Sequence, residues 1–410
     1  MVHLNEPRAR PRKPGRYVPA LVVLLLLIQL IPGARAQAPV ELTHTYTFGQ
    51  IATFTLSADT ATAARLYLRY SFAGAPTTEV IAVPAERPLT YERNLREQPL
   101  PPFATITYWW EYTDAQGRAQ RTAEAVLHYE DNRFAWQTLT EPPLTLHWVA
   151  GDVAQMTAVM DIAQAALDDL EAIFPSATSD PLTIYIYPGL PDLQTALRLS
   201  GRDWIGGEAQ PELGVALVAM PPTANALLEM ERVVPHELAH LSLYRYTGPA
   251  GYDNLPTWLI EGIATHFERR PSVSYALALE NALETGQLLP LESLCGPFPM
   301  EENAVRLAYA QSASVVSYLR RTYGWSGIRA LIAAYTDGLS CEAGLRRALS
   351  LNFIALEREW RAAQAQTGEA ITGPTFWILF TLALRELAPW LILLGVLILP
   401  GVLAILLRTR

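Results

Sequence analysis

Two short stretches decide the fold of this chain: Val234-Pro235-His236-Glu237-Leu238-Ala239-His240 and Pro256-Thr257-Trp258-Leu259-Ile260-Glu261-Gly262-Ile263-Ala264. In the first stretch His236 and His240 are four residues apart, so on a helix both side chains point to one face. Both imidazoles can then bind one metal ion, with Glu237 beside it as a general base. Neutral imidazole nitrogens suit zinc. The first stretch therefore predicts a zinc site, although H-E-x-x-H also occurs by chance in structural helices.

The second stretch supplies a third ligand. Twenty residues separate His240 from Glu261, which is enough for a loop and the first turn of another helix. A carboxylate there completes a set of two histidines and one glutamate, and such a catalytic zinc site keeps its fourth position for water. A carboxylate between Trp258 and Ile263 needs a partner, which argues against a solvated surface glutamate. Gly262 is small and allows the two helices to approach closely.

The paired stretches resemble the gluzincin zinc metallopeptidases, and most of all their peptidase MA-like family. In that family H-E-x-x-H is followed by P-x-W-L-x-E-G-x-A, and residues 256–264 show this pattern. The resemblance covers residues 144–366 and implies a thermolysin-like α+β metallopeptidase domain, placed at 134–366. It implies that His236, His240 and Glu261 bind Zn²⁺, and that Glu237 is the base that activates water for the hydrolysis of a peptide or protein substrate.

Two further residues are assigned through the same resemblance. The segment Tyr309-Ala310-Gln311-Ser312-Ala313-Ser314 resembles Y-x-K-G-A-S of gluzincin aminopeptidases. This match implies that the Tyr309 hydroxyl stabilises the oxyanion, and an ordinary core tyrosine is the alternative. Thr265 stands where some gluzincins place an acid that orients a ligand histidine. A threonine there accepts a hydrogen bond more weakly.

The predicted strand at 214–220 is the candidate for substrate binding. We expect Gly214, Val215 and Ala216 to lie at the edge of a sheet beside the cleft, where an extended peptide can pair with them. A plain interior strand is the alternative. The strand carries no acid that could bind a substrate amino terminus, unlike gluzincin aminopeptidases. Its composition therefore favours an endopeptidase.

Residues 37–133 differ from the rest in periodicity. β-branched and aromatic residues, many of them alternating, predict strands at 45–48, 51–56, 64–72, 79–83, 105–112 and 123–129. The turn residues at 114–117 predict a hairpin. Short strands with polar turns between them predict an all-β sandwich similar to a fibronectin type III or immunoglobulin-like module. From residue 134 on, helical spacing over 153–173 and later segments follows the strands, which is the α+β order.

Both ends of the chain carry apolar runs. A basic start, an apolar run from Val18 to Ile31 and Ala34-Arg35-Ala36 predict a signal peptide at 1–36, with an uncleaved anchor as the alternative. Residues 387–407 predict a transmembrane helix after a linker at 367–386, with a buried core helix as the alternative. The two arginines in the tail 408–410 predict a cytoplasmic C-terminus. We therefore expect a single-pass protein of the cell membrane with an extracytoplasmic catalytic domain.

The net charge bears on the possible partners, and the cysteine content bears on a possible disulfide. The formal net charge is −9, which argues against nucleic acid as a partner. The two cysteines, Cys295 and Cys341, both lie in the predicted exported part. An even count in an oxidising compartment predicts a disulfide, and two free buried thiols are the alternative.

The sequence thus supports three functions. The first is a membrane-anchored zinc metallopeptidase of the cell surface. The second is a binding or adhesion protein with a catalytically degenerate peptidase fold, although such a protein has no physical reason to keep Glu237. The third is a zinc hydrolase of other esters or amides.

Overall fold

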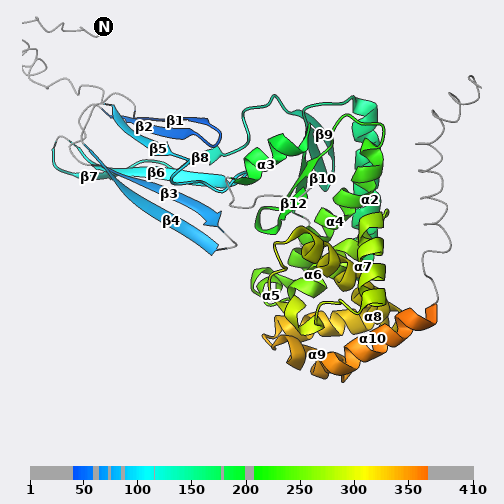
Figure 1. Cartoon of the computed structure of the whole chain (residues 1–410). Helices are drawn as coiled ribbons and strands as arrows, with labels where there is room; N and C mark the ends of the chain where they lie inside the picture. Colours follow the sequence, from blue (N-terminus) through cyan, green and yellow to red (C-terminus); the bar gives the residue numbers. More distant parts are fainter. Residues whose placement is uncertain are drawn as a thin grey trace, which may run out of the picture.

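The computed structural model of the chain describes residues 40–58, 64–72, 75–84, 88–114, 116–176, 180–198 and 207–367 (Figure 1). The predicted signal peptide at 1–36 and the predicted transmembrane helix at 387–407 lie outside these residues. Within these ranges, no helix combines the length and the apolar character that a membrane span requires.

The N-terminal region contains two antiparallel sheets, here called the β-module. One sheet has the order β1-β2-β5, and the other has the order β4-β3-β6-β7 with β8 on β6. Their bounds are β1 (Glu41–Thr47), β2 (Ile51–Ser57), β3 (Ala64–Phe72), β4 (Ala75–Val83), β5 (Leu89–Asn94), β6 (Thr105–Thr113), β7 (Ala119–Arg121) and β8 (Ala125–His128). Phe54 of one sheet meets Tyr108 of the other at 5.1 Å between ring centroids, and both are buried. The predicted β-rich region is confirmed, and β5 was not predicted.

A third sheet forms the centre of the chain, with the order β12-β13-β11-β10-β9. Its strands are β9 (Gln137–Glu141), β10 (Leu144–Trp148), β11 (Leu182–Tyr187), β12 (Gly207–Gln210) and β13 (Val215–Ala219). The strands β10, β11 and β13 are parallel, and β9 and β12 are antiparallel to their neighbours. This sheet lies between the β-module and most of the helices, and the short helix α3 (Leu190–Arg198) packs on the β-module side (Figure 1).

The prediction that Gly214, Val215 and Ala216 form an edge strand is wrong. Strand β13 pairs with β12 on one side and with β11 on the other, so its backbone groups are already used. Gly214 precedes the strand and adopts a left-handed conformation (φ 67°, ψ 30°) after the 3-10 turn η1 (Pro211–Leu213). Strand β12 occupies the edge within the described residues.

Alternation along the strands gives the central sheet two different faces. Ile184, Ile186 and Val218 belong to the core shared with the helices. Tyr185 and Tyr187, which alternate with them, belong to the core shared with the β-module. Successive side chains of a strand point to opposite faces, so the same short strands hold most of the helices on one side and the β-module, with α3, on the other.

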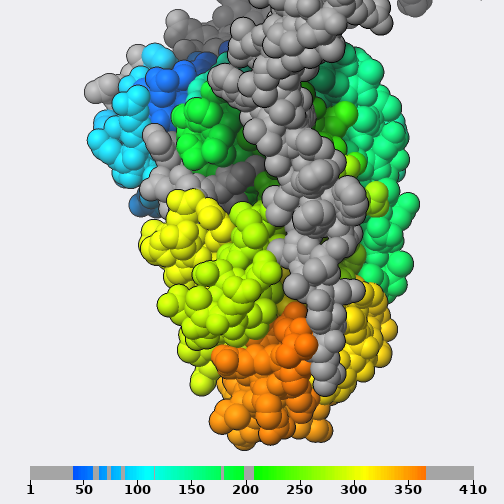
Figure 2. All heavy atoms as spheres, turned by 45° about the vertical axis from the view of Figure 1, so that its right-hand side comes forward, coloured from blue at the N-terminus to red at the C-terminus, as the bar shows by residue number. Residues whose placement is uncertain are grey.

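Most of the remaining chain is helical. The helices are α2 (Val153–Ile173), α3 (Leu190–Arg198), α4 (Ala226–Thr247), α5 (Pro249–Asp253), α6 (Thr257–Phe267), α7 (Val273–Thr285), α8 (Glu302–Thr336), α9 (Cys341–Leu349) and α10 (Phe353–Thr367). Helix α2 begins where the sequence predicts, because the Asp152 side chain accepts the N–H of Gln155 at 2.8 Å and caps it. In the space-filling view α9 and α10 (orange) lie at the end of the molecule away from the β-module (blue) (Figure 2).

Cys295 and Cys341 form a disulfide. The bond joins the short 3-10 helix η2 (Leu291–Cys295) to the first residue of α9. It therefore ties the segment that enters α8 to the segment that leaves it.

Candidate metal centre and active-site cleft

Helix α4 carries both histidines of the H-E-x-x-H stretch. The ring centroids of His236 and His240 lie 5.0 Å apart. Pro235 stands inside this helix, where it has no N–H to donate to the carbonyl of Glu231. That carbonyl instead accepts the backbone N–H of Arg269 at 3.0 Å. The proline therefore leaves an acceptor on α4 to which the segment after α6 attaches, one residue beyond Glu268.

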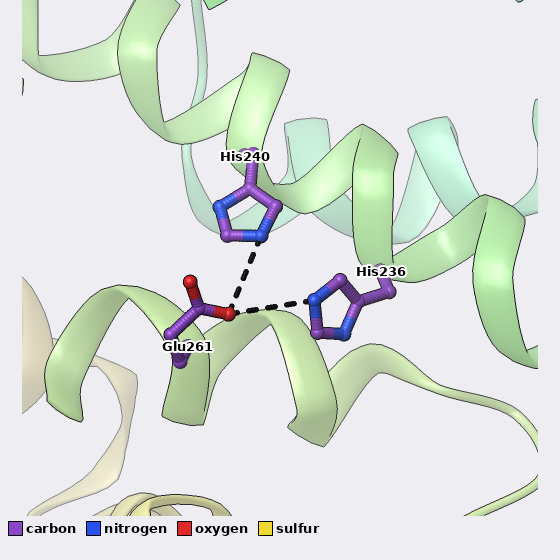
Figure 3. A group of neighbouring side chains, drawn as sticks. All are labelled: His236, His240 and Glu261. Carbon is purple, nitrogen blue, oxygen red and sulfur yellow. Dashed lines mark ion pairs between the residues drawn. The ribbon is translucent and has the colours of Figure 1, made fainter. Parts of the chain in front are cut away.

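Helix α6 brings Glu261 to the histidines. It packs so closely on α8 that a Cβ atom at Gly262 would lie 2.7 Å from the backbone oxygen of Ser312 and 2.7 Å from a methyl group of Val316. A side chain at this contact would force the two helices apart. Because Glu261 and Gly262 are neighbours, the same contact fixes the position from which the carboxylate points toward α4 (Figure 3).

The ligand atoms of the three residues converge. Glu261 Oε2 lies 3.5 Å from His236 Nε2 and 3.6 Å from His240 Nε2 (Figure 3). A tetrahedral zinc ion with bonds of about 2.0–2.1 Å separates its ligand atoms by roughly 3.3–3.5 Å. The spacing and the donor set therefore fit Zn²⁺. Across the residues that the structure describes, this is the one group of at least three His, Cys, Asp or Glu side chains close enough to hold a metal ion.

A second side chain holds the other ring nitrogen of each histidine. His236 Nδ1 lies 3.1 Å from Glu268 Oε1, and His240 Nδ1 lies 3.1 Å from the Tyr252 hydroxyl. A histidine that binds a metal through Nε2 carries its proton on Nδ1 and donates it to such a partner. Both contacts therefore keep the Nε2 atoms directed at Glu261.

Thr265 does not make the contact that the sequence predicts for it. Its hydroxyl is buried and has no hydrogen-bond partner in the described part of the chain. Glu268 makes the contact instead, because seven residues after Glu261 the helical path returns to the same side and glutamate reaches further. That spacing was the available signal for Glu268. Tyr252 lies in α5, between the two motifs, and no pattern pointed to it.

Buried carboxylates dominate the electrostatics of the site. Burial lowers the pKa of His236, but the carboxylates of Glu261 and Glu268 outweigh burial and raise it to about 10. These carboxylates therefore favour a cation at His236. Burial also raises the pKa of Glu237 to about 8; His236 opposes this rise and Glu261 adds to it. A carboxyl group that titrates near neutral pH can both take up and release a proton.

Tyr309 of α8 lies beside the metal centre. Its ring centroid is 6.2 Å from that of His236. Burial and the neighbouring Glu261 raise the pKa of its hydroxyl, which therefore stays protonated and can donate a hydrogen bond. Tyr275 of α7 stacks on Tyr309 at 5.8 Å with an interplanar angle of 4°, and Phe298 meets it edge-on at 5.3 Å. These contacts hold the Tyr309 ring in place.

The strand beside the base is β12. A Cβ atom at Gly207 would lie 2.6 Å from Glu237 Oε1, so the absence of a side chain leaves room for the base. Gly207, His236, Glu237 and Tyr309 line one cavity of about 340 Å³. We call this cavity the active-site cleft because the candidate base Glu237 lines it.

The remaining histidines that the structure describes have other partners. His266 Nδ1 lies 3.0 Å from the Ser317 hydroxyl, and the His266 ring packs against Trp325 at 5.5 Å. Burial lowers the pKa of His266 to about 4, so it is a neutral core residue. His44, His128 and His147 lie within hydrogen-bond distance of Tyr108, Thr105 and Thr138, respectively.

Comparison with known families agrees with this geometry. The sequence model of the Peptidase MA superfamily matches residues 162–366, half of the 410-residue chain. The chain belongs to the peptidase MA superfamily. The superfamily match contains α4 and α6, and with them every residue of the metal centre.

Solved structures show only a distant likeness. An M1 zinc metallopeptidase from Deinococcus radiodurans is 15% identical, with 78% of this chain and 92% of that chain covered, at a TM-score of 0.38. A polysaccharide deacetylase from Bacillus cereus is 7% identical, with 39% and 54% covered, at a TM-score of 0.18. At these TM-scores the likeness carries no argument about activity. No curated protein matches this chain significantly.

Proposed function

We propose that this member of the peptidase MA superfamily is a gluzincin-type zinc metallopeptidase. The observation that carries the proposal is the convergence of His236, His240 and Glu261 on one point, with Glu237 on the wall of the same cleft. Two histidines, one glutamate and a neighbouring acid form the ligand and base set of a hydrolytic zinc site.

The residues of the cleft divide the chemistry of peptide hydrolysis among them. A bound zinc ion would lower the pKa of water and polarise the scissile carbonyl. Glu237 takes a proton from the attacking water and later delivers it to the leaving amine. The Tyr309 hydroxyl donates a hydrogen bond to the developing oxyanion. Glu268 and Tyr252 keep the two histidine rings in their orientation.

The substrate backbone is proposed to pair with β12. This strand ends the sheet within the described residues, and Gly207 at its start lies against Glu237. The expectation of an endopeptidase depends on β13 as the edge strand. The actual edge, β12, carries an acid, Glu208, so that expectation loses its basis.

The location of the enzyme is proposed from sequence alone. Residues 1–36 have the pattern of a signal peptide, and residues 387–407 contain no charged residue and have the length of a membrane span. We infer a single-pass membrane protein whose metal centre faces outward and whose C-terminus is cytoplasmic. The proposed partners are the lipid bilayer and a peptide or protein substrate.

The position of Glu237 favours an enzyme over a degenerate binding protein. Glu237 is buried, with 4% of the residue exposed, and its carboxyl group lies against Gly207 in the cleft. Burying a carboxylate costs several kcal/mol unless it is compensated, so a binding protein gains nothing from keeping one there.

The test uses the full chain purified in detergent. Wild type is expected to hold about one zinc ion per chain by mass spectrometry and to cleave a mixture of peptides. Glu261→Ala is expected to lose most of the zinc, and Glu237→Gln to keep the zinc and lose hydrolysis. Zinc-loaded wild type that cleaves no more peptide than Glu237→Gln would overturn the proposal.

A further inference from the structure

The active-site cleft is lined by aromatic and apolar groups as well as by His236 and Glu237. Tyr275, Pro299, Met300 and Val305 are among them, and Met300 is 86% exposed at the rim. A cavity of about 340 Å³ is at the lower end of the range for small-molecule sites and is large enough for one or two peptide side chains.

Two arginines also line this cleft, from two different helices, together with the acids Glu237, Glu268 and Glu302. Arg232 precedes His236 by one turn of α4, and Arg306 precedes Tyr309 by one turn of α8. Residues one turn apart lie on the same face of a helix. Each arginine therefore stands next to a residue of the reaction centre, on the side that faces the cavity.

Tyr275 lines the same cleft as both arginines. Burial raises the pKa of the Tyr275 hydroxyl to about 12, nearby acids add to the rise, and Arg232 and Arg306 both act to lower it. Arg232 and Arg306 therefore both place positive charge in the cleft that Tyr275 lines.

The acids that pair with these arginines occupy only some of the guanidinium N–H donors. Arg232 pairs with Glu229 at 3.0 Å, and Arg306 pairs with Glu302 at 2.6 Å, each within a single helix. The arginine side chains are 29% and 34% exposed, and their acids are 54% and 70% exposed. Such exposed pairs contribute little energy. A guanidinium has five N–H donors, and with the described residues Arg232 uses two groups (Nε and Nη2) and Arg306 one.

We propose that Arg232 and Arg306 select a carboxylate on the substrate, close to the scissile bond. The inference depends on the proposed peptidase function and names the substrate class of the same cleft. One helical turn places each guanidinium within one or two residues of the reacting carbonyl along an extended peptide. Guanidinium and carboxylate form strong paired hydrogen bonds. The carboxylate comes either from an acidic side chain or from the C-terminus of the substrate.

The test compares matched peptides on the full zinc-loaded chain in detergent. One pair carries Glu or Gln next to the scissile bond, and the other pair carries a free acid or an amide at a C-terminus within two residues of it. We expect wild type to prefer the charged member of one pair by about ten- to hundredfold in kcat/KM. Preference for Glu assigns the side chain, and preference for the free acid assigns the C-terminus.

Variants connect that preference to the two arginines. Arg232→Gln and Arg306→Gln are each expected to lower the charged-to-neutral ratio about tenfold, and Arg306→Lys to restore part of it. Arg321→Gln is the control: Arg321 is an exposed arginine further along α8 that does not line the cleft, and the ratio should stay at the wild-type value.

Binding separates failure of this inference from failure of the peptidase proposal. Calorimetry measures the affinity of the same peptides for Glu237→Gln, with and without each arginine, and needs no hydrolysis. Tighter binding of the carboxylate that depends on the arginines supports the inference even if no peptide is cleaved. The inference would be overturned if proteins with both arginines bound and cleaved the charged and neutral peptides equally. The proposal that the protein is a zinc peptidase would then still stand.

Discussion

The two faces of the central sheet are built from different chemistry. The face toward the helices presents aliphatic side chains such as Ile184 and Ile186, which pack with α2 and α4 in one core. The opposite face combines the aliphatic side chains of Val215 and Leu217 with Tyr185 and Tyr187. Their hydroxyls donate to Glu130 at 2.9 Å and to Asp131 at 3.0 Å, in the segment that leaves the β-module.

The difference shows how each side is positioned. Apolar packing is non-directional, so the helical side is set by shape and volume. Hydrogen bonds have preferred angles, so the β-module side is also set by direction. Asp131 is fully buried and is held by Arg133 at 2.6 Å as well as by Tyr187. The β-module is therefore docked in one orientation on the sheet that supports α4.

Gly262→Val is expected to have the largest effect, because it disrupts the packing of α6 on α8. The new side chain would collide with the Ser312 backbone and force α6 away from α8, which moves Glu261 out of reach of the histidines. We expect the free energy of unfolding to fall by about 3 kcal/mol and zinc to be lost. Mass spectrometry and urea unfolding measure both. Gly296→Ala is the control, because a Cβ there meets nothing within 4 Å; a zinc-loaded, active Gly262→Val would contradict the account.

A volume change on the aliphatic face is expected to have the next largest effect. Ile186 is 1% exposed and lies in the core that carries α4. Ile186→Ala should lower the free energy of unfolding by about 2–5 kcal/mol, and Ile186→Val by about 0.5–1.5 kcal/mol. Urea unfolding of the metal-free protein measures both without the contribution of bound zinc. Equal, small losses for the two variants would show that this face is not tightly packed.

Changing Glu268, which contacts His236, is expected to have a smaller effect that is limited to zinc affinity. Glu268→Gln keeps the shape of the side chain and removes its charge, so zinc affinity should fall about 10- to 100-fold, measured by competition with a chelating dye. Thr265→Val, three residues earlier in α6, is the matched comparison. Its hydroxyl has no described partner, so affinity and stability should stay at or above the wild-type values. The reverse ranking would return the ligand-orienting role to Thr265.

Local patterns in the sequence predicted the parts of the fold that depend on local structure. Helix α2 has the predicted bounds, because its apolar period and its cap lie within the segment itself. The residues that form the metal centre could be proposed from spacing, since one helix fixes His236 relative to His240. Strand β12 was missed: its sequence, Gly-Glu-Ala-Gln, has no β-branched residue, and it is a strand only because β13 lies beside it.

Contacts that form through tertiary packing could not be predicted from the sequence. Tyr252 reaches His240 from the short helix α5, and Tyr275 reaches Tyr309 from α7. Arg232 and Arg306 are 74 positions apart and meet only in the folded cleft. Such contacts depend on how α4, α7 and α8 cross, which no short pattern specifies.

The smallest expected effect tests whether the two faces act independently. Tyr187→Phe removes one hydrogen bond to Asp131 and keeps the ring among Phe134 and Trp136, which contact it edge-on at 5.8 and 5.2 Å. We expect the free energy of unfolding to fall by about 1 kcal/mol, because Arg133 still satisfies the buried carboxylate. Zinc affinity should stay within about twofold of wild type, since stability at distant sites is additive.

Zinc affinity decides between the two readings of this variant. An unchanged affinity would mean that the tyrosine face only docks the β-module and that α4 is positioned by the aliphatic face alone. A tenfold loss would mean that β11 transmits the change at the docking contact to α4. The β-module would then help to position the metal ligands. Tyr185→Phe, on the same face and with its own carboxylate partner, then shows whether that transmission belongs to one hydrogen bond or to the whole interface.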